Sequence, residues 1–207
     1  MKADILKAVD DAIRAANLLK SDICVDFMLK ASRMISNCFL NGGKIIIAGN
    51  GGSLCDAMHF AEELTAYFRE KRKALPAIVL SEAGHLTAVS NDTDYDSVFE
   101  RGVEAFLKKE DIFISLTTSG NSKNIFKGIN KAKELNGKTI SFLGKTGGIV
   151  KGLSDLEIII EGFKYSDRIQ EAHMTMIHII IEMVEKIMFS PKETLKKLIS
   201  KELLKNL

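Results

Sequence analysis

Hydrophobic and polar residues recur along the chain with two different periods. Over residues 3–20 the apolar side chains return every three or four positions, which predicts an amphipathic helix. A second helix is predicted over residues 21–40, because Asn41-Gly42-Gly43 forms a stop signal directly after it. These two helices form a helical N-terminal preface, and the pattern then changes.

Short, almost wholly apolar runs follow the preface, and each predicts a β-strand. β-branched residues without polar alternation are typical of strands that are buried on both faces, as in parallel sheets. The five runs are KIIIAG (44–49), AIVL (77–80), the start of DIFISLTTSGNS (111–122), KTISFLG (138–144) and LEIIIEG (156–162).

Helical patterns separate these strands. We expect them at residues 54–71, 95–108, 123–135 and 167–189, the last ended by Ser190-Pro191. Alternation of strand and helix predicts an α/β fold, a three-layer sandwich with a five-stranded parallel sheet flanked by helices. We expect one domain over residues 1–207: N-terminal helices at 1–40, an α/β core at 41–188 and a charged C-terminal helical extension at 189–207.

The charge balance excludes two classes of partner. The formal net charge is +2, so no electrostatic footprint for nucleic acid or a membrane surface is present. The lysines between residues 192 and 205 alternate with acids and leucines, as in a solvated helix. Charges interrupt the N-terminal helix at nearly every turn, and no apolar run reaches about 18 residues, so neither a signal peptide nor a membrane span is expected.

The three cysteines, Cys24, Cys38 and Cys55, are widely spaced. They form no C-x-x-C pair, which argues against a disulfide framework and against a thiolate zinc site. Free thiols fit a reducing compartment, and we therefore expect a cytoplasmic protein.

Two polar turns follow predicted strands, at 49–53 (Gly-Asn-Gly-Gly-Ser) and 117–122 (Thr-Thr-Ser-Gly-Asn-Ser). Ligands bind beyond the carboxyl ends of parallel strands, where glycine N–H groups, hydroxyls and a helix N-terminus together suit a phosphate. The first turn also fits a plain turn with Ser53 as helix cap. It is no dinucleotide loop, since Leu54 occupies the third glycine position, and neither turn is a Walker A loop. Four hydroxyl residues within six positions favour phosphate binding in the second turn.

Histidines and acids accompany these turns. His59 and Glu63 share one helix face, as a surface ion pair or as functional groups. The apolar helix 167–189 carries His173 and His178, and a buried histidine needs a partner, as a hydrogen-bonded core residue, a ligand or an acid–base group. His85 follows the second strand, and Asn91-Asp92 come shortly after it. Together these groups suit proton transfer beside the carbonyl of a phosphorylated small molecule.

Four stretches resemble one known family: GNGGSLCDAMHFAEELT, SND (90–92), TTSGNS and DRIQEAHMTMIHIIIEMVE. The chain is similar over about residues 1–188 to the sedoheptulose 7-phosphate isomerases, or phosphoheptose isomerases, of the sugar isomerase (SIS) domain superfamily. The resemblance implies a homotetramer that converts D-sedoheptulose 7-phosphate to D-glycero-D-manno-heptose 7-phosphate, the first step toward the heptose of bacterial lipopolysaccharide or capsule. It also implies one zinc ion per subunit.

The resemblance further implies roles for individual residues, with Glu63 as the base and His178 as its acid partner. The implied zinc ligands are His59, Glu63, Gln170 and His178. The implied substrate contacts are Asn50, Gly51, Gly52, Ser53, Asn91, Asp92, Thr117, Thr118, Ser119, Ser122 and Gln170. Gln170 and His178 lie eight residues apart, about 12 Å along a straight helix. We therefore expect either a site shared between subunits or a ligand set that lacks one of the two.

This sequence departs from the family pattern at three places. Thr117 replaces a common serine, Tyr67 replaces an arginine, and residues 189–207 extend past the usual end. Relatives such as the DnaA initiator-associating protein are non-catalytic tetramers, but a scaffold has no chemical reason to keep Glu63, Gln170 and His178. A sugar-phosphate sensor domain is disfavoured because no DNA-binding unit accompanies this domain. An isomerase for another phosphorylated ketose is the remaining alternative.

Overall fold

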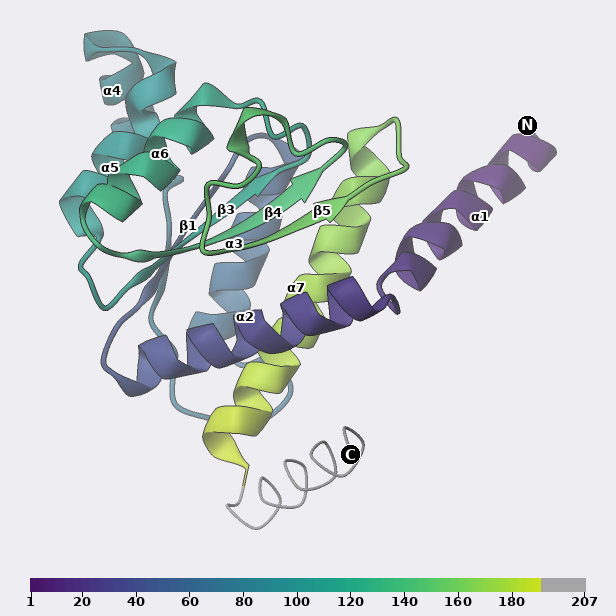
Figure 1. Cartoon of the computed structure of the whole chain (residues 1–207), viewed down its shortest axis with the longest axis horizontal. Coiled ribbons are helices and arrows are strands. Elements are labelled where there is room, and N and C mark those ends of the chain that lie inside the picture. The colour runs from purple at the N-terminus through teal and green to yellow at the C-terminus, as the bar shows by residue number, and fades with distance from the viewer. Residues whose placement is uncertain (191–207) are drawn as a thin grey trace.

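The five predicted strands form one parallel sheet in the order β2-β1-β3-β4-β5 in the computed structural model, which describes residues 1–190 (Figure 1). The strands are β1 (Ile45–Gly49), β2 (Ala77–Val79), β3 (Ile112–Thr117), β4 (Lys138–Gly144) and β5 (Leu156–Ile160). Their positions agree with the predicted runs, and the predicted fold class is confirmed.

Alternate residues of each strand face two separate hydrophobic cores. In β1, Ile45 and Ile47 belong to one core, whereas Ile46 and Ala48 belong to the other, as the two-residue period of a strand requires. Both sets are fully buried, which explains why the strands read as continuous apolar runs rather than as alternating ones.

Helices cover both faces of the sheet and complete the three layers (Figure 1). The first core packs under α2 (Asp22–Leu40), α3 (Gly52–Thr65) and α7 (Ser166–Phe189). The second packs under α5 (Val98–Phe106) and α6 (Lys123–Glu134), with short 3-10 turns η1 (Tyr95–Ser97) and η2 (Gly148–Val150) beside them. Because α3 and α7 lie on the same face, their side chains can meet across a gap of more than 100 residues in sequence.

Two helices differ from the predictions. The helix predicted at 54–71 ends at Thr65, where the chain leaves the helical conformation at Ala66 and Arg72 bonds the carbonyls of Glu63 and Leu64. Residues 83–92, for which the sequence pattern predicts no helix, form α4 (Ala83–Asp92). The Glu82 carboxylate caps this helix by accepting from the backbone N–H groups of Gly84 and His85.

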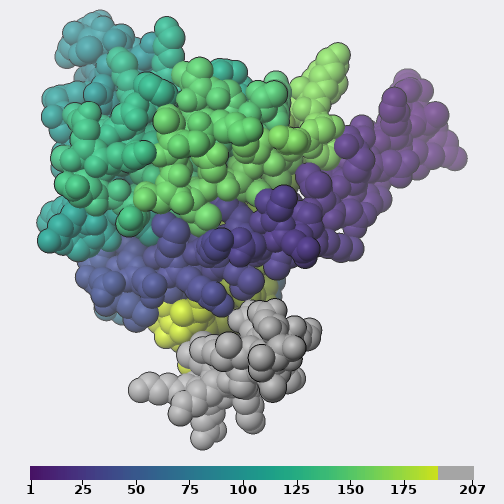
Figure 2. Space-filling view, in the orientation of Figure 1, coloured from purple at the N-terminus to yellow at the C-terminus, as the bar shows by residue number. Residues whose placement is uncertain are grey.

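The first helix, α1 (Lys2–Leu18), stands out from the body as an arm (Figure 2). Only Ala15 of α1 is buried, while the apolar face predicted from the sequence is exposed. The exposed apolar side chains are Ile5, Leu6, Val9 and Ile13. At the base of the arm the Arg14 guanidinium lies over the Phe163 ring, 4.1 Å from its centre. The predicted C-terminal extension, from residue 191 onward, lies outside the described residues.

Candidate active site

A polar cavity of about 190 Å³ lies where the two predicted phosphate loops come together. It joins the turn after β1, the turn after β3 and the first turns of α7, so it lies beyond the carboxyl ends of neighbouring strands as expected. We call it the hydroxyl cavity. Its lining residues are Asn50, Ser53, Leu116, Thr117, Thr118, Ser119, Ser122, Ser166 and Gln170.

Helix capping does not account for the hydroxyls of this cavity. The residue that precedes α3 is Gly51, with φ at +56°, so Ser53 does not hold the cap position that the plain-turn interpretation gave it. Ser122 does precede α6, yet its side chain makes no capping hydrogen bond; its Oγ lies 3.4 Å from the Thr117 Oγ1 instead. These hydroxyls therefore remain available to a ligand.

Asn50 is held in the cavity by two residues that the sequence analysis did not identify. Its amide exchanges two hydrogen bonds with the buried amide of Asn124, at 2.9 and 3.0 Å. The Tyr95 hydroxyl donates to the same Asn50 oxygen over 2.8 Å. Single polar residues of this kind carry no motif, so no sequence signal separated them from ordinary surface residues.

Gln170 also lies at this cavity. A Cβ on Gly52 would come within 2.5 Å of the Gln170 Nε2, so Gly52 is glycine because the amide approaches its backbone closely. On the opposite wall the Thr118 hydroxyl donates to the Ser166 Oγ over 3.0 Å. The first turn of α7 therefore closes the cavity that the two loops form.

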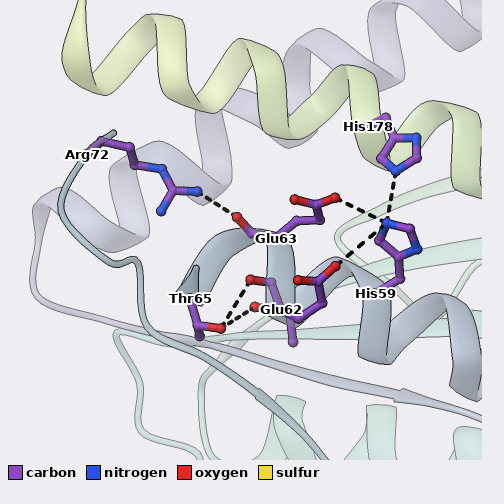
Figure 3. Close-up of polar contacts among 7 residues, drawn as sticks. His59, Glu62, Glu63, Thr65, Arg72 and His178 are labelled. Carbon is purple, nitrogen blue, oxygen red and sulfur yellow. Dashed lines mark hydrogen bonds and ion pairs between the residues drawn. The ribbon is translucent and has the colours of Figure 1, made fainter. Parts of the chain in front are cut away.

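A second cluster, which we call the histidine corner, joins α3 to α7 farther along both helices (Figure 3). It consists of His59, Glu63 and His178, whose ligand atoms all lie within 4.8 Å of one another. The His59 Nε2 lies 3.2 Å from the Glu63 Oε1 and 3.2 Å from the His178 Nε2. The Phe68 ring stacks on the His178 imidazole at 5.7 Å between centres.

The donor set of the histidine corner fits a divalent metal ion. One imidazole nitrogen carries at most one proton, so the His59 Nε2 cannot donate to both of its neighbours. Two imidazoles with one carboxylate form a common catalytic zinc set, and tetrahedral bonds of about 2.1 Å place neighbouring ligand atoms about 3.4 Å apart. Burial and the neighbouring His59 both lower the pKa of His178, which favours the neutral, metal-binding imidazole.

Some predicted residues do not take the place that the prediction gave them. Gln170 and His178 lie on one continuous helix, about 12 Å apart along its axis, and Gln170 as a fourth ligand stays a prediction. Asn91 and Asp92 end α4, where the Asn91 amide donates to the Asp92 carboxylate over 2.9 Å, and neither lines the hydroxyl cavity. The His85 Nε2 lies 2.9 Å from the Val98 carbonyl oxygen and holds α4 to the next helix.

His173 is a buried, hydrogen-bonded core residue rather than a ligand or an acid–base group. It is fully buried, its Nε2 donates to the Leu143 carbonyl over 3.0 Å, and its ring meets Phe142 edge-on. Burial lowers its pKa to about 4, so it is neutral at physiological pH. Asp56, whose Oδ2 is buried without a partner, has its pKa raised to about 6 by the same cause.

Comparison with known proteins identifies the family. Residues 23–144 match the SIS domain family. Curated relatives include a phosphoheptose isomerase of Fusobacterium nucleatum, 51% identical over 77% of this chain and 82% of the relative. Another is a phosphoheptose isomerase of Yersinia pestis, 49% identical over 83% of this chain and 89% of the relative.

Solved structures agree with this assignment. A phosphoheptose isomerase from Francisella tularensis superposes with a TM-score of 0.84 at 29% identity, covering 90% of this chain and 99% of that one. One from Neisseria gonorrhoeae gives 0.82 at 30% identity, covering 89% and 98%. The chain therefore belongs to the SIS domain family of phosphosugar isomerases, and within it to the phosphoheptose isomerases.

Proposed function

We propose that this chain converts D-sedoheptulose 7-phosphate to D-glycero-D-manno-heptose 7-phosphate through an enediol. The observation that carries the proposal is the way α3 and α7 join the two sites. Each helix begins at the hydroxyl cavity, with Ser53 and Gln170, and reaches the histidine corner with His59 and His178. The separation is about 9 to 12 Å along the helices, the scale of an extended seven-carbon sugar.

The hydroxyl cavity is the proposed phosphate site. It offers neutral donors from Ser119 and Ser122, the amide of Asn50 and the N-terminal N–H groups of α3 and α6. Hydroxyl and backbone donors near a helix N-terminus suit a dianion without a paired cation. Gly51, Gly52, Ser53, Thr117, Thr118 and Gln170 complete the proposed contacts, and Asn91 and Asp92 are further proposed contacts that the family resemblance implies.

The histidine corner is the proposed site of proton transfer. Glu63 removes the proton from C1 of the ketose, and His178 moves the proton on the sugar oxygen or opens the ring. Glu63 has 19% of its side chain exposed, so its carboxylate is screened from bulk water while it still faces the corner. The second carboxylate oxygen allows Glu63 to face the substrate while the first meets a metal.

We propose zinc as the metal, one ion per subunit. His59, Glu63 and His178 would hold it, and Gln170 is the fourth ligand that the family resemblance implies. Bound zinc supplies a Lewis acid that polarises a carbonyl oxygen. The donor set supports this assignment, because nitrogen with carboxylate ligands at this spacing suits zinc.

We also propose a homotetramer with sites shared between subunits. The exposed apolar face of α1 is the kind of surface that a second copy covers. Mixing an inactive Glu63→Gln chain with an inactive His178→Ala chain tests the sharing of sites. Because Glu63 and His178 of one chain already meet in the histidine corner, we expect inactivity to persist after proven subunit exchange, so that any sharing involves other contacts of the site. Returned activity would mean that one subunit's Glu63 works with another's His178.

The proposed cellular context is bacterial heptose synthesis for lipopolysaccharide or capsule, in the cytoplasm. Cys24, Cys38 and Cys55 are all free thiols, which suits a reducing compartment. No helix within residues 1–190 is long and apolar enough to cross a membrane. A non-catalytic tetrameric binding protein is not favoured, because such a protein has no use for three converging ligand atoms beside a phosphate-type cavity.

The deciding experiment follows the reaction by NMR. Sedoheptulose 7-phosphate is added to the protein, with and without a zinc chelator, and the C1 and C2 signals are recorded. We expect an aldose signal to appear, and in deuterated water we expect deuterium to enter at C2 of the aldose. No conversion by zinc-loaded protein would contradict the proposed activity, and a ketose of another chain length that reacts faster would replace the proposed substrate.

A further inference from the structure

Arg72 is a buried cation that joins the two helices of the histidine corner. Only 3% of its side chain is exposed, and all three guanidinium nitrogens are used. Its Nε donates to the Glu185 carboxylate of α7 over 2.7 Å. Its terminal nitrogens donate to the backbone carbonyls of Glu63 and Leu64, each at 2.7 Å, and of Ala66 at 3.0 Å. Figure 3 shows the guanidinium directed at the carbonyl of Glu63.

These bonds complete the last turn of α3. The final carbonyls of a helix have no partner within the helix and must be satisfied otherwise. Here the Ala66 N–H donates to the Glu62 carbonyl and the Leu75 N–H donates to the Leu64 carbonyl. Arg72 also donates to the Leu64 carbonyl and bonds the carbonyl of Glu63. No glycine stands at this helix end to form the usual terminating turn. The backbone carbonyl of Glu63, the proposed base, is therefore bonded by the side chain of Arg72, which follows the helix in sequence.

The same guanidinium also contacts α7 at a defined position along the helix axis. Glu185 follows His178 by seven residues, two turns along the same helix face and about 10 Å away. α3 and the segment after it are thus tied to α7 at separate levels, first through His59 and His178 and second through the buried Arg72–Glu185 pair, with the more exposed Arg69–Glu182 ion pair between them. The second link lies outside the cluster of ligand atoms and does not depend on a metal.

We propose that Arg72 is a positioning residue that holds Glu63 and His59 on α3 in register with His178 on α7. The inference rests on the proposed roles of these three groups in catalysis and zinc binding. A guanidinium suits the task, because its planar fork serves a carboxylate and several carbonyls at once, whereas a lysine ammonium cannot span them. Loss of Arg72 would keep His59, Glu63 and His178 in the chain but would let their side chains shift relative to one another. Even small shifts matter in a metal or proton-transfer site.

The test compares Arg72→Met with a variant that removes the cation of another partly buried ion pair. Lys44→Met removes a lysine from the Lys44–Asp111 pair, whose members directly precede β1 and β3, where Asp111 is 3% exposed, and neither residue lies on α3 or α7. Each variant is assayed well below its melting temperature for kcat, for KM and for the dissociation constant of Zn²⁺ by chelator competition. The zinc measurement needs no turnover, so it remains decisive if the proposed substrate is wrong.

We expect Arg72→Met to lower kcat and to weaken zinc binding, each by roughly 10- to 100-fold, as for other residues that orient metal ligands. KM should change by less than about threefold, since the hydroxyl cavity lies at the opposite ends of both helices. Arg72→Lys should recover part of the loss. Lys44→Met should lower the melting temperature but leave kcat and zinc affinity within about twofold.

Unchanged kcat and zinc affinity in folded Arg72→Met would overturn the proposal, and so would an equal loss in Lys44→Met. If Arg72→Met fails to fold, Arg72→Lys and Glu185→Gln replace it, because each keeps a polar group in the same place. Normal zinc affinity in both of these variants would then contradict the positioning role. Failure of the wild-type chain to act on the heptose phosphate would instead count against the proposed function.

Discussion

The hydroxyl cavity and the histidine corner are built in different ways. The cavity takes most of its lining from two loops, each a continuous stretch of six residues or fewer. The corner takes its three members from two helices, and His59 and His178 lie 119 residues apart in sequence. In the loops, one hydroxyl residue can replace another, as threonine replaces serine, while the backbone N–H donors stay in place. The corner depends on the register of two helices, so a small shift of either disturbs all three groups.

The two regions should therefore fail differently when they are altered. In the proposed reaction the cavity provides neutral donors to the phosphate, which keeps its charge throughout, so these contacts should stabilise bound substrate and transition state alike. The corner contains the groups that are proposed to exchange protons in the transition state. We expect cavity variants to raise KM and corner variants to lower kcat.

The largest effect is expected for Glu63→Gln. The amide keeps the size of the side chain but cannot remove a proton, so kcat should fall by about 10²- to 10⁴-fold while KM changes little. Steady-state kinetics with sedoheptulose 7-phosphate measures both constants. Deuterium exchange at C1 of the ketose should be lost together with turnover.

The adjacent acid provides the control for this variant. Glu62 lies on the same helix with 60% of its side chain exposed, and its carboxylate is 3.8 Å from the His59 Nε2. Glu62→Gln should keep kcat within about threefold, since an exposed ion pair of this kind contributes little. Equal losses in both variants would show that charge near His59, rather than a base at Glu63, is what the reaction needs.

Local sequence signals were enough for the sheet and the cavity. The strands are buried on both faces and so read as apolar runs, and the hydroxyls cluster in one short turn. The helix at 83–92 was missed because its cap is a glutamate, Glu82, rather than one of the usual capping residues. The end of α3 was misplaced because it depends on Arg72, whose partners come from two helices.

The parts of the site that escaped prediction share one physical property. Asn124, Tyr95 and Arg72 act through contacts between segments distant in sequence, and such contacts leave no spacing or periodicity to read. The apolar pattern of α7 equally could not tell which of its histidines lies outside the core, although the family resemblance selected His178 for the proposed role. Burial decides it: His173 faces the sheet, whereas His178 faces α3.

A smaller effect is expected for Ser122→Ala in the hydroxyl cavity. The variant removes one hydroxyl that makes no capping bond, so α6 should be unaffected. A hydrogen bond to a charged group contributes about 1.5 to 3 kcal/mol, and KM should rise roughly 10- to 100-fold with kcat nearly unchanged. Titration of the protein with inorganic phosphate, followed by NMR, provides a measure of binding that does not require turnover.

Ser32→Ala is the matched control for this loss of a hydroxyl. The Ser32 Oγ donates to the Met28 carbonyl within α2 and is buried away from the cavity. Its replacement should leave KM and phosphate affinity as they are. A fall in kcat with unchanged KM in Ser122→Ala would contradict the division between the two regions.

The smallest effect on catalysis is expected for His173→Leu, the other histidine of α7. Its folded pKa of about 4 lies below the ordinary value of 6.5, so the unfolded chain binds the extra proton first as the pH falls. The stability that the neutral ring contributes is complete above pH 6.5 and is lost between pH 6.5 and about 4. The loss amounts to about 1.4 kcal/mol for each pH unit.

Denaturant unfolding of the wild type and of His173→Leu between pH 7 and 4 measures this contribution. Asp56, with a pKa raised to about 6, titrates in the opposite direction over part of the window, so the difference between the two proteins is the informative quantity. That difference should shift in favour of the variant by roughly 3 kcal/mol from pH 7 to pH 4. Ile180→Val, a loss from the same buried helix face without a titrating group, should differ from the wild type equally at every pH. A flat difference for His173→Leu, or a kcat at neutral pH lowered as far as in Glu63→Gln, would mean that His173 belongs with the histidine corner rather than with the core.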